Sequence, residues 1–61
     1  MISYLSGKLL YHTADGAVIL VGSVGYEVLG IWLGRETIGT ELAIYTYHYI
    51  ENESLPRLIG C

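Results

Sequence analysis

Apolar residues occur in short runs along most of the chain, and these runs predict β-strands almost everywhere. Residues 2–12 contain Gly7 in the middle of an apolar run, which predicts a strand that bends at this glycine. Residues 13–16 end in Asp-Gly, a strong hairpin signal, so a second strand at residues 17–21 should pair antiparallel with the first. That second run is apolar without alternation, which indicates a strand buried on both sides.

The next predicted strand, residues 24–28, follows a tight connection at residues 22–23 and completes a three-stranded meander. Side chains alternate between the two faces of a strand. One face carries Val24, Tyr26 and Val28, and the other carries Gly25 and Glu27. The pattern of residues 29–40 is looser and rich in glycine, so we expect a connector with one helical turn or a loop.

Residues 41–51, ELAIYTYHYIE, form the clearest predicted strand because they are rich in Tyr, Thr and Ile. One face carries Leu42, Ile44, Thr46, His48 and Ile50, and the other carries Ala43, Tyr45, Tyr47 and Tyr49. On this apolar face His48 is expected to be a partly buried, hydrogen-bonded histidine. A last short strand is expected near residues 57–60. Pro56 has no N–H to donate, so that strand should begin late or lie at an edge.

Five short strands with a connector between the third and the fourth predict an all-β fold, a small five-stranded OB-fold barrel of Greek-key type. Other small β-barrels fit the periodicity nearly as well. A chain of 61 residues has room for a single domain, 1–61, whose core is marginal unless oligomerisation, metal or disulfides add to it.

Composition leaves oligomerisation as the source of extra burial. The chain is 52% hydrophobic and 15% charged, so part of its surface should meet a partner. Cys61 is the only cysteine, which excludes a disulfide within the chain, and with His12 and His48 it gives no paired spacing for zinc or another metal. We find no apolar run long enough for a membrane span and no signal peptide, so we expect a cytoplasmic protein.

The charged residues argue against a tight grip on DNA by this chain alone. The net charge is −3, and three scattered basic residues cannot neutralise many phosphates. The sequence also assembles no nucleophile, base and oxyanion donors, and no phosphate-binding loop. We therefore expect neither catalysis nor a cofactor.

One stretch is more specific than the pattern. Residues 21–28, VGSVGYEV, closely resemble the VGGVGYEV signature in the amino-terminal domain of the RuvA family, the bacterial Holliday-junction branch-migration subunits. The opening residues 1–7 are similar to the MIxxLxG start of that family, and residues 44–47, IYTY, are similar to its VYTY strand. Residues 58–61 occupy the place of its closing LYGF, with Cys61 where the family carries Phe. The resemblance covers essentially the whole chain.

The resemblance implies a first domain of a three-domain protein that acts in DNA recombination and repair. The other two domains are a DNA-binding helix-hairpin-helix domain and a small helical domain that contacts the motor ATPase RuvB. This chain matches only the first. In the family, four first domains form a homotetramer that holds four-way junction DNA open and planar. The chain would then be a noncatalytic accessory subunit, with ATP-driven helicase activity in the RuvB-like partner.

Several residues form a structural signature under this interpretation. Gly22 and Gly25 would let two barrel strands meet at a sharp corner without a Cβ clash. Tyr26 and Glu27 would supply a packing ring and a charge to opposite faces. The full signature is Gly7, Gly22, Gly25, Tyr26, Glu27 and Gly60. A direct DNA contact by Tyr26 or Glu27 is the less favoured alternative.

An acidic pin is the main functional feature that the resemblance implies. Family members carry a VRED motif after the fourth strand, and its Glu-Asp pair repels phosphates at the crossover. By position, Ile50 matches Val, Glu51 matches Arg, Asn52 matches Glu and Glu53 matches Asp. This sequence lacks the arginine and has one carboxylate at the two pin positions, although Glu51 keeps two carboxylates in the loop. The alternative is a solvated hairpin tip.

Two further classes of function stay open. Tyr45, Tyr47 and Tyr49 form an aromatic ladder that could stack unpaired bases, as in a stand-alone single-strand nucleic-acid-binding module. The strand has no basic neighbours, so packing in the core or in a subunit interface is favoured for this ladder. The other class is an OB-like assembly protein without nucleic acid, which the acidic balance favours.

Overall fold

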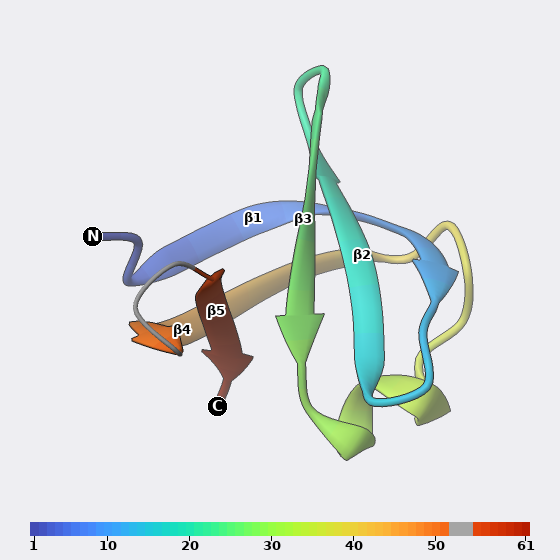
Figure 1. The fold of residues 1–61 in the computed structure, drawn as a ribbon. Helices are drawn as coiled ribbons and strands as arrows, with labels where there is room; N and C mark the ends of the chain where they lie inside the picture. The colour runs from blue at the N-terminus through green and yellow to red at the C-terminus, as the bar shows by residue number, and fades with distance from the viewer. Residues whose placement is uncertain (52–54) are drawn as a thin grey trace.

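The computed structural model describes residues 1–51 and 55–61, which form a closed barrel of five strands and one short 3-10 helix (Figure 1). The elements are β1 Tyr4–His12, β2 Gly16–Val21, β3 Val24–Leu29, η1 Ile31–Arg35, β4 Glu41–Glu51 and β5 Leu55–Gly60. The strand order around the barrel is β1-β2-β3-β5-β4, and the pairing of β3 with β5 is the parallel one. The predicted all-β, five-stranded barrel is confirmed, and the closed mixed sheet is consistent with an OB-fold.

Strands β1, β2 and β3 form the predicted antiparallel meander. The backbone N–H of Thr13 donates to the carbonyl of Gly16 over 2.9 Å and closes the first hairpin. In β2, Ala17 and Ile19 are fully buried in the core. Val18 points the other way and is still only 8% exposed. This strand is therefore covered on both faces, as its unbroken apolar run predicted.

The first strand begins at Tyr4, two residues later than predicted, and it changes partners along its length. Lys8 pairs with both β4 and β2, so the strand belongs to two sides of the barrel. We predicted a bend at Gly7, but the irregularity in the pairing lies between Leu9 and Tyr11. At this point Leu9 turns its backbone to the connector, donating to the carbonyl of Thr40 over 2.9 Å.

The connector at residues 29–40 contains one helical turn, η1, which was one of the two forms predicted for it. Leu33 of η1 is fully buried and belongs to the core cluster. Trp32 donates from Nε1 to the carbonyl of Gly60 over 3.1 Å, which joins the helix to β5. Nε2 of the His12 ring lies 2.9 Å from the carbonyl oxygen of Glu36 and donates to it. These contacts fix the connector against the end of the barrel.

The core lies inside the closed sheet and draws on every element. Its buried cluster consists of Leu5, Leu9, Ala17, Ile19, Val28, Leu33, Ile44 and Leu58. The chain start is attached to β4, because the N–H of Ile2 donates to Nδ1 of His48 over 3.0 Å. Thr46 donates from Oγ1 to the carbonyl of Ile2 over 2.8 Å. The prediction for His48, a partly buried and hydrogen-bonded side chain, is confirmed.

The two last strands correct one prediction. β4 has the predicted bounds. The strand with Pro56 was expected to begin late or to lie at an edge; the late start was wrong, because β5 begins at Leu55 and includes Pro56, whereas the edge position fits the pairing. Pro56 pairs with Ile50 of β4, whereas the described pairing of β5 with β3 begins only at Leu58. The proline therefore lies where β5 has β4 as its one described neighbour, a position that tolerates a missing N–H.

Candidate functional site

The octapeptide 21–28 forms the turn between β2 and β3 and most of β3. Gly22 has φ of 63°, in the left-handed region that glycine enters without a steric penalty. A Cβ at Gly22 would have nothing within 4 Å, so the prediction that this glycine prevents a clash at a corner was wrong. Its role comes from the backbone angle of the tight turn instead.

The other residues of the motif lie on the two faces of β3. A Cβ on Gly25 would come within 3.0 Å of Cγ1 of Val18, so this glycine leaves room for a neighbouring side chain. Tyr26 is half-buried and packs against the core cluster. Glu27 is exposed. The predicted split into a packing ring and a charge on opposite faces is confirmed.

The close approaches between strands occur at the remaining signature glycines. A Cβ on Gly7 would overlap the carbonyl oxygen of Leu20, which β2 holds against β1. A Cβ on Gly60 would lie 2.9 Å from Cγ1 of Val28 and 3.1 Å from Cγ2 of Ile44. Both glycines are therefore required by the packing of the barrel.

An open hollow of about 270 Å³ adjoins the motif. It is lined by Ile2, Gly25, Tyr26, Glu27, His48 and Leu58. Tyr26, Glu27 and His48 are its ionisable residues, and Nδ1 of His48 already accepts the hydrogen bond from Ile2. This lining suits apolar packing, and it provides no nucleophile with a base beside it.

The proposed pin residues fall at the end of β4. Glu51 is the last residue of that strand, and its backbone pairs with Leu55. Asn52 and Glu53 lie outside the described residues. The pin at Glu51, Asn52 and Glu53 therefore stays a prediction.

The aromatic ladder lies on the outside of the barrel. Tyr45 is 71% exposed and Tyr47 is 61% exposed, so neither ring is part of the core. The rings form two pairs, Tyr4 with Tyr45 at a centroid distance of 5.2 Å and Tyr47 with Tyr49 at 5.9 Å. We call Tyr4, Tyr45, Tyr47, Tyr49 and Ile59 the tyrosine face.

Tyr4 is a member of this face that sequence reasoning missed. It pairs with Tyr45 across β1 and β4, and it is 50% exposed. The alternation of residues 4–9 contained the signal, since Tyr4 precedes the buried Leu5 and must point outwards. The pairing of β1 with β4 was the missing information.

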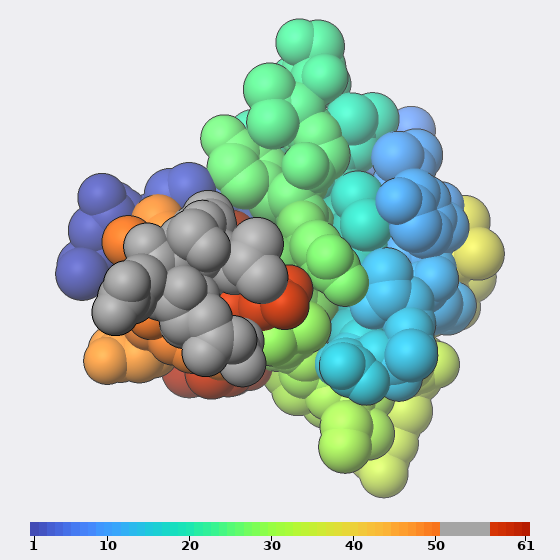
Figure 2. Space-filling model, viewed as in Figure 1, coloured from blue at the N-terminus to red at the C-terminus, as the bar shows by residue number. Residues whose placement is uncertain are grey.

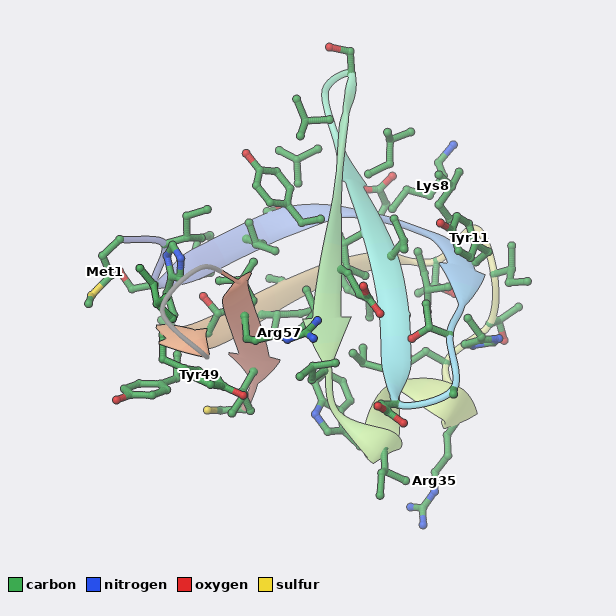
Figure 3. All side chains as sticks on the ribbon, in the orientation of Figure 1. Met1, Lys8, Tyr11, Arg35, Tyr49 and Arg57 are labelled. Carbon is green, nitrogen blue, oxygen red and sulfur yellow. The ribbon has the colours of Figure 1, made fainter. Side chains whose placement is uncertain are left out.

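Arg57 of β5 pairs with Tyr49 and so adjoins the tyrosine face, but the basic side chains do not cluster there. Figure 3 shows Lys8, Arg35 and Arg57 well separated, on β1, at the end of η1 and on β5. Lys8 and Arg35 are exposed, whereas Arg57 is half-buried. The three cations of the chain therefore form no cluster that could hold several phosphates together.

Within residues 1–51 and 55–61, no three His, Cys, Asp or Glu side chains lie close enough together to hold a metal ion. In the same ranges, no helix has the length and apolar character needed to cross a membrane.

Comparison with known proteins gives consistent results. The family model described as the RuvA N terminal domain matches residues 1–58. The Holliday junction branch migration complex subunit RuvA of Desulfatibacillum aliphaticivorans is 42% identical over 65 residues, covering 98% of this chain and 32% of that protein. The subunit of the same name from Desulfosudis oleivorans is 41% identical over 66 residues, covering 98% of this chain and 32% of that protein. The chain thus spans about a third of the length of these relatives.

Proposed function

The chain belongs to the RuvA N-terminal domain family, and we propose that it serves as the noncatalytic scaffold domain of a Holliday-junction-binding subunit in branch migration. In this role it forms the core of a homotetramer that holds four-way junction DNA. Contact with a RuvB-like motor ATPase would be made outside residues 1–61. The observation that carries the proposal is the match of the family model to residues 1–58.

The physical properties of the barrel support a scaffold role more than tight DNA binding by this domain. Its three cations are dispersed, so most of the affinity for phosphates must come from elsewhere in the assembled subunit. Several large apolar side chains are exposed on its surface, and two of them, Tyr45 and Tyr47, lie on one face. A surface of this kind is suited to contact between protein subunits.

We further propose that the carboxylates of Glu51 and Glu53, which we call the acidic loop, guide DNA strands by repulsion. Glu51 ends β4, and Glu53 follows it in the sequence. Several subunits that present carboxylates around one axis would raise the energy of phosphates near that axis. A carboxylate about 8 Å from a phosphate in water costs about 0.5 kcal/mol, and salt reduces this cost. Repulsion of this size steers strands apart without binding them.

The test compares binding of the chain to a four-way junction, a linear duplex and single-stranded DNA at low and moderate salt. We expect preference for the junction. The double variant Glu51→Gln/Glu53→Gln should bind the junction roughly 3- to 10-fold more tightly at low salt, because phosphate repulsion is removed. The matched control is Glu36→Gln/Glu41→Gln, which removes the same charge outside the loop. Equal tightening in the control, or equal affinity for junction and duplex, would contradict the proposal.

A single-strand-binding module is the second candidate, because Tyr45 and Tyr47 are exposed and accessible to bases. Base stacking on an aromatic ring contributes about 1–3 kcal/mol per base. Under this alternative, Tyr47→Ala should weaken binding to unstructured DNA about 5-fold or more. Tyr11→Ala, which changes a ring 52% exposed on β1, should have no such effect. Under the scaffold proposal, neither substitution changes single-strand binding.

A further inference from the structure

The first half of β3 has an outer edge that no described strand covers. On the side away from β2, β3 pairs with β5 only at Val28 and Leu29 within the described residues. Figure 1 shows β5 beside the arrowhead end of β3, and Figure 2 shows the tip of the β2–β3 hairpin projecting beyond the rest of the surface. The pairing stops where it does because Pro56, two residues before Leu58, has no N–H to continue the ladder.

The uncovered edge presents the backbone of Gly25. Val21 and Val24 close the two-residue hairpin loop, and hydrogen-bonded pairs alternate with non-hydrogen-bonded pairs along an antiparallel ladder. Gly25 therefore directs its N–H and C=O away from β2, whereas Tyr26, opposite Ile19, directs its own towards β2. An unpaired edge of this kind is a template for another extended chain.

The open hollow beside the motif lies along this edge. Residues 25–27 of β3 form one side of it, and the other side comes from Ile2, His48 and Leu58. Its volume of about 270 Å³ is below the roughly 300–1,000 Å³ of pockets that enclose drug-sized ligands. Because most of the lining is apolar, the hollow suits one or two apolar side chains of a bound chain.

The charge at this edge is negative. Glu27 is exposed, and among the described lining residues it is the acidic one. His48 adds no positive charge in this arrangement, because its Nδ1 accepts the hydrogen bond from Ile2 and so carries no proton. Arg57, next to Leu58 on β5, is half-buried and does not line the hollow. Charge complementarity therefore favours a basic occupant, as does the net charge of −3.

We propose that this edge of β3 binds an extended segment of another protein in which apolar and basic residues alternate. On β3, Tyr26 turns inwards to the core cluster and Glu27 turns outwards. The side chains of an added strand alternate in the same way, so one set enters the hollow beside Tyr26 and the other set lies beside Glu27. The backbone of the segment pairs with the N–H and C=O of Gly25. This contact does not depend on the proposed scaffold function.

The test uses three synthetic heptapeptides. The first alternates lysine and valine, the second has the same composition with all lysines before all valines, and the third alternates glutamate and valine. Fluorescence anisotropy of the labelled peptides at low salt measures their affinity for the chain. We expect the alternating basic peptide to bind about 10-fold more tightly than the other two, because it alone presents an apolar set and a basic set on opposite sides.

Glu27→Gln tests the charge, and Glu41→Gln is its matched control. Glu41 is also exposed, but it pairs with Lys8 at the start of β4 and does not line the hollow. Glu27→Gln should weaken binding of the alternating basic peptide about 2- to 5-fold, the range of an exposed ion pair. Glu41→Gln should weaken it less than about 1.5-fold. Circular dichroism checks that both variants keep the fold.

Amide hydrogen exchange followed by NMR locates the contact. When about 90% of the chain is bound to the alternating basic peptide, exchange at Gly25 should slow about 10-fold, because only the unbound tenth exchanges. The N–H of Tyr26, which already points to β2, should change little and is the internal control. Absence of binding, equal affinity for the three peptides, equal losses in the two variants, or unchanged exchange at Gly25 would overturn the inference. Slow exchange at Gly25 in a concentrated sample without peptide would assign the edge to a second copy and overturn it as well.

Discussion

Replacing Gly7 with alanine is expected to remove most of the stability of the fold at room temperature. The added Cβ would overlap the carbonyl oxygen of Leu20 and lie 3.0 Å from Cγ2 of Val21. The first obstacle is backbone that β2 holds in the barrel, so β1 and β2 would have to separate. We expect a loss on the order of 3 kcal/mol or more. A core of this size rarely supplies more than about 3–5 kcal/mol, so little stability would remain.

Gly34→Ala is the matched control, because a Cβ there meets nothing within 4 Å and no positive φ is required. Its free energy of unfolding, measured with urea, should stay within about 0.5 kcal/mol of the wild type, or rise slightly because the unfolded chain loses freedom. Both variants should be compared at one chain concentration, because assembly stabilises the folded state. Equal midpoints for Gly7→Ala and the wild type would show that β1 and β2 are not in close contact at Gly7.

Local sequence signals were sufficient to predict most of the barrel. The Asp-Gly turn at residues 15–16 placed the first hairpin, and the alternation of residues 41–51 gave β4 with its bounds. The start of β5 could not be predicted in this way. Whether Pro56 is tolerated depends on which strand lies beside it, and that neighbour is set by the parallel pairing of β3 with β5. Non-local pairing leaves no signal in a single sequence.

The candidate site was also only partly predictable, because burial and strand pairing are not visible in the sequence. Alternation correctly put Tyr45 and Tyr47 on one face of β4, but it could not say whether that face was core or surface. Tyr4 joins them only because β1 pairs with β4 in this register. The role of Gly22 was assigned to crowding, whereas its positive φ is the relevant property. Backbone angles and strand partners are properties of the closed sheet, and the linear pattern specifies neither.

Ile44 and Ile50 show most clearly that the linear pattern does not specify burial. Alanine substitutions at the two positions should change the free energy of unfolding by very different amounts. The two residues are the same type on the same face of the same strand, yet Ile44 is 1% exposed and Ile50 is 64% exposed. Ile44→Ala should lower the free energy of unfolding by about 2–5 kcal/mol, because it removes buried methyl groups and leaves a cavity. Ile50→Ala should change it by no more than about 0.5 kcal/mol.

The difference follows from where each isoleucine lies along β4. Ile44 pairs with Leu5 of β1, in the part of the strand that crosses the core. Ile50 pairs with Pro56, beyond the point where the described contact between β3 and β5 begins. Urea unfolding of both variants measures the contrast, and an unchanged slope with denaturant would show that the unfolded states are comparable. Equal losses at the two positions would mean that the barrel interior extends to the end of β4, next to the acidic loop.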